Sequence, residues 1–310
     1  MSLSRGRCER RVDRYRMRRA TARDSGGRGR PWGAVLPWLP LLPFFLFGLL
    51  MEVIPVATVL VSSLRDAGGS ATLENYRRAL SPAIRASFAN SIRLSAVTAA
   101  LGVVLGSLAG YAIHRSRSAL FHRAATALAD VATNFGGAPL AFAFIVTLGS
   151  TGIVTLLLSK ALGIALYPRF RIYSISGLVL AYLYFQVPLM ILLVQPALRG
   201  LRREWKEAAL NLGASTAQYW VRIGLPILAP SLAGGFLLLF ANAYGAYATA
   251  WTLTGADINL VTIRIAALVR GEVQLEPGTA DAMAALSVLV MAVCVFGYLW
   301  TNRLGRRGRS

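Results

Sequence analysis

The sequence predicts an all-α integral membrane protein with six transmembrane helices and both termini in the cytoplasm. Hydrophobic residues make up 55% of the 310 residues and charged residues only 15%, which is too little polar surface for a soluble domain of this length. Six apolar segments are each long enough for a helix to cross a hydrocarbon core of about 30 Å. They lie near residues 35–62, 89–113, 124–148, 174–198, 229–253 and 281–302.

Two apolar segments depart from a simple spanning helix. The first span is over-long and contains several prolines, including Pro55, so we expect it to be tilted or kinked. A seventh stretch, 152–164, is too short to span and contains Lys160. We expect it to form an interfacial or re-entrant helix on the outer side.

The basic residues set the orientation of the chain. With the N-terminus inside, 23 of the 33 basic residues lie in cytoplasmic segments and 10 in outer ones. This bias predicts a multi-pass protein of the cell membrane, with a membrane domain over 31–305 and a short basic tail over 306–310. We expect the Arg-rich segment 1–30 to be disordered and to attract anionic lipid rather than nucleic acid. Its charged region is too long for a cleaved secretory signal.

Several kinds of chemistry lack the residues that they need. No G-x-x-x-x-G-K-[ST] phosphate loop occurs, so ATP hydrolysis by this chain is excluded. Cys8 and Cys294 cannot form a disulfide framework, and no Cys/His cluster suggests a metal site. His114 and His122 have no nucleophile arrangement around them. We therefore expect neither an enzyme nor a cofactor or metal bound by this chain.

The segment 199–228, between the fourth and fifth spans, is charged but has the apolar spacing of two short helices. Gly213 can adopt the positive φ at which the first helix stops. Ser215 and Gln218 have the spacing of a capping box for the second helix, which we expect Pro226 to end. Such a pair of helices is either a membrane-surface element or a docking element for a soluble partner.

The same segment carries a longer pattern. Glu207-Ala208-Ala209 is followed after three residues by Gly213, and after nine more by Ile223-Gly224-Leu225-Pro226. This spacing resembles the EAA signature of ABC importer permeases, the inner-membrane components of binding-protein-dependent transport systems. The likeness covers roughly residues 35 to 303. It includes Thr72-Leu73-Glu74-Asn75-Tyr76, Asn90-Ser91, Gly110-Tyr111, Asn134-Phe135-Gly136-Gly137 and Tyr244-Gly245-Ala246-Tyr247-Ala248-Thr249-Ala250.

The resemblance implies the type I ABC importer permease fold, with 199–228 as the coupling loop that fits a cleft of the ATPase. The residues implied in this contact are Glu207, Ala208, Ala209, Gly213, Ile223, Leu225 and Pro226. The implied partners are a cytosolic ABC ATPase dimer that uses ATP, a second homologous permease or second copy of this chain, and an extracytoplasmic solute-binding protein. The spermidine/putrescine-type first permease is the most similar kind, which implies a polyamine-type substrate. Iron, phosphonate, sulfate and thiamine importers share most of these features.

Polar and aromatic residues inside the spans are candidates to line a solute pathway. In the fifth span we expect positions 242, 245, 249 and 252 to share one helical face, with Ala248 on another. Aromatic faces in such a pathway would suit an organic cation, although helix packing and an aromatic belt are the alternative. The pathway candidates are Asn242, Gly245, Tyr247, Thr249, Thr252, Tyr184 and Glu52.

Two other functional classes are open on the sequence alone. A gradient-driven secondary transporter would not need the 199–228 loop and usually shows inverted repeats and broken helices. An intramembrane enzyme would need a catalytic constellation that the sequence lacks.

The orientation is tested by cysteine labelling in intact cells. In a background without Cys8 and Cys294, we expect an impermeant reagent to label a cysteine at Ser70 or Asp257, because these positions lie in outer segments. A cysteine at Ser118 should stay unlabelled until the membrane is permeabilised. Labelling of position 118 from outside would contradict the six-span orientation.

Overall fold

The computed structural model describes residues 41–66, 68–164, 167–271 and 276–307, and this part of the chain is almost entirely helical. A single antiparallel bridge, between Arg65 and Ala71, is the one β feature within it. The predicted tail over 1–30 lies outside these residues, as do 308–310 of the tail predicted over 306–310, whereas 306 and 307 belong to the last helix. The helices are α3 (Leu42–Gly48), η2 (Leu49–Val53), α4 (Ile54–Ser62), α5 (Glu74–Ala79), α6 (Pro82–Arg115), α7 (Ala119–Asn134), α8 (Gly137–Leu148), α9 (Ile153–Leu162), α10 (Ile175–Arg199), α11 (Arg203–Asn211), α12 (Thr216–Tyr219), η3 (Trp220–Gly224), α13 (Leu225–Gly245), α14 (Ala248–Thr254), α15 (Val261–Arg270) and α16 (Pro277–Arg307).

The predicted number of spans is confirmed. By length and composition, 6 helical stretches of the described chain could cross a membrane. They are Leu42–Ser62, Pro82–Arg115, Gly137–Leu162, Ile175–Arg199, Thr216–Gly245 and Pro277–Thr301. The fold class predicted from composition and apolar segments is therefore correct.

The chain divides into two compact units, residues 1–58 and 59–310. In the first unit, the irregularity expected near Pro55 is present as a π-turn over Leu49–Val53. The Ile54 N–H donates to the Leu49 carbonyl five residues back, which is the hydrogen-bond pattern of a π-turn. Glu52 lies within this turn, and its side chain is exposed in this structure.

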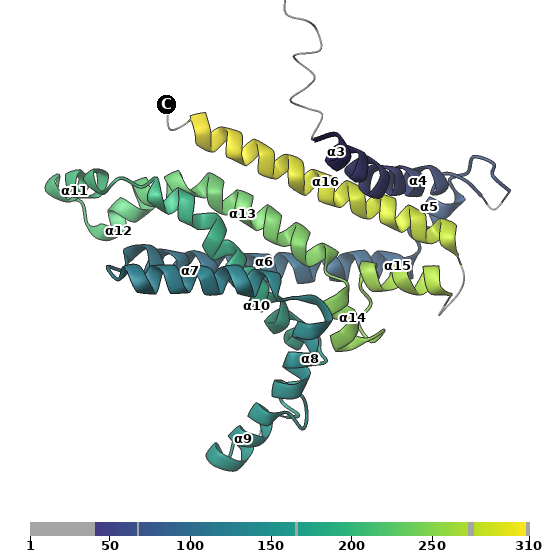
Figure 1. The fold of residues 1–310 in the computed structure, drawn as a ribbon, viewed down its shortest axis with the longest axis horizontal. Helices are drawn as coiled ribbons and strands as arrows, with labels where there is room; N and C mark the ends of the chain where they lie inside the picture. Colours follow the sequence, from purple (N-terminus) through teal and green to yellow (C-terminus); the bar gives the residue numbers. More distant parts are fainter. Residues whose placement is uncertain (1–40, 67, 165–166, 272–275, 308–310) are drawn as a thin grey trace, which may run out of the picture. The chain divides into compact units, whose positions relative to one another are not determined.

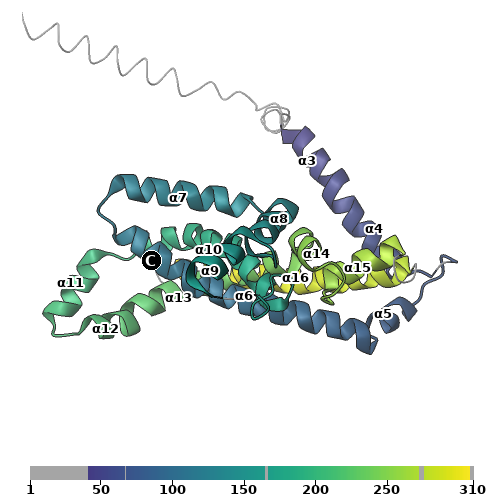
Figure 2. The same ribbon diagram turned by 90° about the horizontal axis from the view of Figure 1, so that it is seen from below.

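The second unit is built around long helices that pack side by side. Helix α13 packs against both α6 and α16, and α10 packs against α6 (Figure 1). Helices α11 and α12 lie at one end of these long helices, and α5 and α15 lie at the other. Helices α8 and α9 project away from the bundle, and the view from below shows α9 end-on in front of it (Figure 2). The predicted inner loop 199–228 thus lies at the end opposite α5 and α15, whereas the predicted outer segment with α9 projects from the side of the bundle.

The contact between α6 and α10 depends on glycine. Gly102, Gly106 and Gly110 recur at every fourth position, so they share one face of α6. A Cβ on Gly106 would lie 2.5 Å from the Met190 Cβ, and one on Gly110 would lie 2.6 Å from a methyl group of Val194. Neither site has room for a side chain, so the helices approach as closely as small residues allow in membrane proteins.

Two buried glutamines of α10 add polar contacts to the same interface. The Gln186 Nε2 donates to the Thr98 Oγ1 at 3.1 Å, and the Gln195 Nε2 donates to the Gly110 carbonyl at 3.2 Å. Both side chains are buried, at 0% and 5% exposure. Hydrogen bonds between spans contribute modestly, about 0.6 kcal/mol on average, but they fix the register of the two helices.

A second set of buried polar contacts joins segments of the chain at the end of the unit that carries α5. The Asn75 Nδ2 donates to the carbonyls of Ser63 and Arg65 at 3.1 and 2.8 Å. The Asn75 side chain also lies against Gly278, where a Cβ would come within 2.7 Å of it. The Ser62 hydroxyl donates to the Asp281 carboxylate at 2.5 Å. These contacts give the Thr72–Tyr76 stretch a structural role.

Two predicted spans are wrong as continuous helices. The third, 124–148, is interrupted because Gly136 is extended and Gly137 has φ +69°, so α7 ends and α8 starts in a new direction. The fifth, 229–253, is interrupted because Ala246 leaves the helical region, with φ −73° and ψ 92°. Helix α9 confirms a short helix within 152–164, but its place at the membrane stays a prediction.

Replacing Gly106 by Ala should destabilise the bundle by about 1–3 kcal/mol, because the added methyl would overlap the Met190 side chain. Thermal unfolding in detergent measures this change. Gly136→Ala is the matched control, since a Cβ there meets nothing within 4 Å. Equal melting temperatures for the two variants would contradict the close α6–α10 contact.

Candidate functional site

The corner between α11 and α12 is built as the sequence predicts. Gly213 has φ +83°, a backbone conformation that side chains with a Cβ rarely adopt. The Ala214 N–H donates to the Ala209 carbonyl at 3.0 Å, and the Gly213 N–H donates to the Leu210 carbonyl at 3.0 Å. This pair of bonds is the Schellman arrangement, which satisfies the last carbonyls of α11. A Cβ on Gly213 would meet nothing within 4 Å, so the requirement for glycine lies in the backbone.

The predicted capping box of the second helix is confirmed. The Gln218 N–H donates to the Ser215 Oγ at 3.2 Å, and the Ser215 N–H donates to the Gln218 Oε1 at 2.8 Å. The expectation that Pro226 ends this helix is wrong. A π-turn over Trp220–Gly224 joins α12 to α13, and Pro226 lies in the first turn of α13, where a missing N–H is tolerated. Thr216–Gly245 is therefore one helical stretch of 30 residues.

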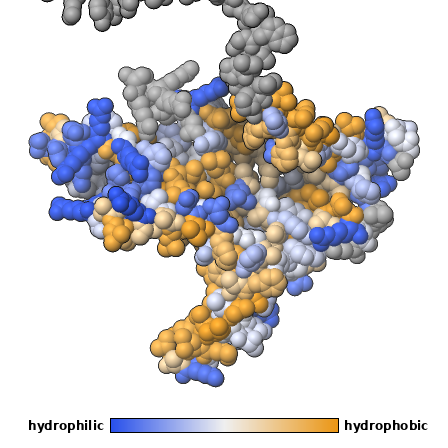
Figure 3. Space-filling model, viewed as in Figure 1, coloured by the Kyte–Doolittle hydropathy of each residue, from blue (hydrophilic) through white to orange (hydrophobic). Residues whose placement is uncertain are grey.

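The residues of the EAA pattern divide into two groups. Ala209 is buried and Ile223 is half-buried, so these two face the protein. Glu207, Ala208, Gly213, Leu225 and Pro226 are exposed. The Glu207 carboxylate accepts from the Arg203 Nε at 2.9 Å, as an exposed pair on α11. Figure 3 shows hydrophilic side chains gathered over this end of the unit and hydrophobic ones over α8 and α9.

Leu212 is the contact candidate that the sequence analysis missed. Its side chain is 89% exposed, immediately before Gly213 at the corner. A large apolar side chain presented in this way beside the exposed EAA residues is available to a partner. The signal in the sequence was a leucine in the three-residue gap of the EAA pattern.

A cavity of about 540 Å³ lies where the two interrupted spans meet. One side of it comes from the α7–α8 junction, and another comes from the α13–α14 junction. Phe185 of α10 completes the described lining. The eleven lining residues are Thr133, Gly136, Gly137, Phe185, Ala241, Asn242, Gly245, Ala246, Tyr247, Ala248 and Thr249.

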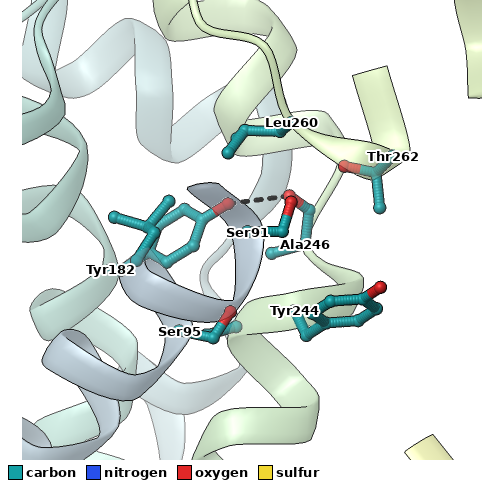
Figure 4. A pocket seen from close by; sticks show the side chains of 9 residues that line it. Ser91, Ser95, Tyr182, Tyr244, Ala246, Leu260 and Thr262 are labelled. Carbon is teal, nitrogen blue, oxygen red and sulfur yellow. Dashed lines mark hydrogen bonds between the residues drawn. The ribbon is translucent and has the colours of Figure 1, made fainter. Parts of the chain in front are cut away.

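Hydrogen bonds hold the α13–α14 junction in place. The Tyr182 hydroxyl, on a side chain that is 1% exposed, donates to the Ala246 carbonyl at 2.8 Å, as Figure 4 shows. The Thr249 Oγ1 donates to the Gly137 carbonyl at 3.3 Å, which links α14 to the start of α8. A carbonyl freed by a helix break inside a membrane must find another donor, and Tyr182 supplies one here.

A small polar hollow lies beside this junction. Ser91, Ser95, Tyr182, Tyr244 and Thr262 line it together with four apolar or small residues (Figure 4). The Ser91 Oγ accepts from the Val261 N–H at 2.9 Å, which joins α6 to the first residue of α15. The hydroxyls therefore connect three helices on one side of the cavity.

The structure brings together four of the seven predicted pathway residues. Asn242, Gly245, Tyr247 and Thr249 line the cavity, whereas Thr252 does not. Ala248, which we expected on another face, lines it as well. The prediction of one continuous face was wrong because the helix stops at Gly245 and α14 starts with a new phase.

The other two pathway candidates are Tyr184 and Glu52. Tyr184 packs edge-on against Phe135 and Phe144, with ring centroids 6.2 and 6.0 Å away. Glu52 belongs to the first unit, and its role in a pathway stays a prediction. No group of three His, Cys, Asp or Glu residues in the described ranges is arranged to hold a metal ion.

Comparison with known proteins places this architecture in a family. Residues 102–310 match the family described as binding-protein-dependent transport system inner membrane component. The chain belongs to this family. The permease is thus a multi-pass inner-membrane subunit of an ABC importer and not an enzyme, because a separate subunit hydrolyses ATP.

Individual relatives cover most of the permease but differ in their named substrates. It is 27% identical over 288 residues to the trehalose transport system permease protein SugB of Mycobacterium tuberculosis, covering 90% of this chain and 96% of that one. It is 31% identical over 165 residues to the spermidine/putrescine transport system permease protein PotB of Haemophilus influenzae, covering 52% and 56%. A bacterial ABC transporter that imports the acidic polysaccharide alginate shares the fold, with a TM-score of 0.65 at 16% identity over 89% of this chain and 98% of that one.

Replacing Tyr182 by Phe keeps the buried ring but leaves the Ala246 carbonyl without its donor. We expect a loss of about 1–3 kcal/mol in stability, the usual cost of an unpaired buried polar group. Thermal unfolding in detergent measures it, with Tyr184→Phe as the control because Tyr184 is half-exposed. A Tyr182→Phe protein as stable as the control would show that the Tyr182 bond does not hold the junction.

Proposed function

We propose that the permease moves a small solute through the cavity between its two helix breaks. One observation carries this proposal: the α7–α8 and α13–α14 junctions, far apart in sequence, line the same cavity. Non-helical backbone at membrane depth is tolerated where it is buried in protein or lines a water-filled cavity. Gly136, Gly137 and Gly245 let a solute approach the backbone itself.

Residues 199–228 couple this cavity to the ATPase. The stretch Thr216–Gly245 begins at the α11–α12 corner and ends at the cavity, so one helix joins the two sites. At about 1.5 Å per residue, its 30 residues span roughly 45 Å. A displacement of the corner by the ATPase is therefore carried to Gly245 and Ala246 without an intervening loop.

The contact with the ATPase involves the exposed residues of the EAA pattern. Glu207, Ala208 and Gly213 are part of this surface, with Glu207 as its charged group, and Leu212 supplies an apolar anchor. Ala209 and Ile223 hold the corner from inside. The remaining partners are a second permease subunit, or a second copy of this chain, and an extracytoplasmic solute-binding protein.

A gradient-driven carrier is the alternative class, and broken helices are common in such carriers. The breaks at Gly136 and Ala246 therefore do not separate the two classes. The α11–α12 corner and the family membership favour ATP-driven import.

The relatives support the transport function but do not single out one substrate. The polyamine-type substrate stays a prediction, since the named substrates of the relatives include trehalose as well as spermidine and putrescine. The spermidine/putrescine relative matches only 52% of this chain, so its substrate carries no special weight.

Replacing Gly213 by Val should abolish co-purification of the ATPase and lower uptake at least tenfold, while membrane insertion stays intact. The reason is that a β-branched residue at φ +83° costs about 1–2 kcal/mol or more and shifts the corner. Gly213→Asn is the matched control, because Asn tolerates positive φ. Full uptake by the Val variant would remove the docking role.

Charge and apolar contact at the corner are tested separately. Glu207→Lys and Leu212→Asp should each weaken ATPase association in a pull-down at least tenfold, because one reverses a charge and the other removes the apolar anchor. Lys206→Glu, also on α11, controls for the general effect of a charge change on this loop. If neither variant differs from that control, the ATPase binds elsewhere.

A further inference from the structure

The cavity is chemically distinctive because none of its eleven described lining residues carries a charge. Its hydrogen-bonding side chains are the Asn242 amide and the hydroxyls of Thr133, Tyr247 and Thr249. Its aromatic rings are those of Phe185 and Tyr247. Uncharged donors and acceptors mixed with ring faces are the lining that a pocket for an uncharged, hydroxyl-bearing ligand needs.

One charged side chain lies over an aromatic ring of this lining. The Arg270 guanidinium lies 5.8 Å from the centroid of the Tyr247 ring and 5.6 Å from that of Trp251. The two rings stack on each other, 6.1 Å apart and 21° from parallel. Arg270 therefore occupies an aromatic face of a lining residue, the kind of face that would otherwise attract a cationic solute.

We infer that the permease cavity takes a neutral saccharide. This inference rests on the proposed role of the cavity as the solute pathway. It replaces the polyamine expectation with a class of solute that the lining itself favours.

The size and polarity of the cavity support a saccharide over the other classes. A volume of about 540 Å³ falls in the usual range for organic ligands, roughly 300–1,000 Å³, and is far larger than a tetrahedral oxyanion requires. A polyamine carries several charges, and its ammonium groups would enter without a carboxylate partner among the described lining residues, which is costly. A sugar instead presents hydroxyls to Asn242 and Thr133 and an apolar face to Phe185.

Backbone at the α7–α8 break adds to the same surface. Gly136 lines the cavity, and a Cβ on it would meet nothing within 4 Å, so its backbone is open to a solute. Sugars carry many donors and acceptors in several directions, so a wall of mixed backbone and side-chain groups matches them better than it matches a point charge. Uncharged groups also bind weakly, which a transport pathway requires in order to release its solute.

Binding to the full-length permease in lipid nanodiscs tests the inference. The probes are maltose, sucrose and cellobiose as neutral saccharides, and spermidine and sodium sulfate as the competing classes. Saturation-transfer NMR detects weak binding, and fluorescence of Trp251, which stacks on Tyr247, reports on the cavity. We expect at least one saccharide to bind at least tenfold more tightly than spermidine and sulfate.

Two variants locate the bound saccharide. Asn242→Leu should weaken saccharide binding at least tenfold, since Asn242 is exposed to the cavity and has no structural hydrogen bond recorded. Ser159→Leu makes a similar polar-to-apolar change at an exposed position of α9, outside the lining, and should bind as the unmodified permease does.

The possible failures can be told apart. If spermidine or sulfate binds more tightly than every saccharide, and Asn242→Leu removes that binding, the proposed class of solute is wrong but the cavity remains the pathway. If Asn242→Leu does not change saccharide binding, the cavity is not the binding site. Absence of saccharide binding in a permease that still co-purifies its ATPase overturns the inference and leaves the coupling role standing.

Discussion

The close contact between α6 and α10 is the constraint on which the second unit depends. Glycines at 106 and 110 let the α6 backbone approach the side chains of Met190 and Val194 without an intervening layer. Helices in a bilayer gain little from excluding lipid, so packing at this distance supplies much of their attraction. Helix α10 is thereby held as a fixed support, and its Tyr182 and Phe185 reach the α13–α14 junction and the cavity.

The fixed position of α10 explains why two helix breaks persist beside each other. A break exposes carbonyl and amide groups that lipid cannot satisfy. At Ala246 the buried Tyr182 hydroxyl supplies a donor, and at Gly137 the Thr249 hydroxyl does the same. The irregular backbone is therefore part of a fixed structure, in which polar groups of neighbouring helices replace the missing helical bonds.

The sequence was sufficient where local chemistry decides the structure. Apolar length predicts the six spans, Gly213 predicts the positive-φ corner, and Ser215 with Gln218 predicts the capping box. The sequence was insufficient where contacts between residues far apart in the chain decide the structure. Ala246 has no helix-breaking side chain, so the end of α13 depends on Tyr182, which lies 64 positions away. The G-x-x-x-G spacing in α6 was visible in the sequence, but its partner helix was not. Thr252 and Ala248 were assigned to the wrong faces for the same reason.

The buried polar contacts around Asn75 have a consequence for how the protein is synthesised. The bond from Ser62 to Asp281 joins residues 219 positions apart, and Gly278 must also arrive before the Asn75 side chain is covered. Contacts of such long range form late, because the intervening chain has to be synthesised first. The first five spans are therefore inserted while this end of the bundle is still open. The last helix closes it, so a chain truncated before residue 277 leaves the polar groups of Ser62 and Asn75 without Asp281 and Gly278 as neighbours.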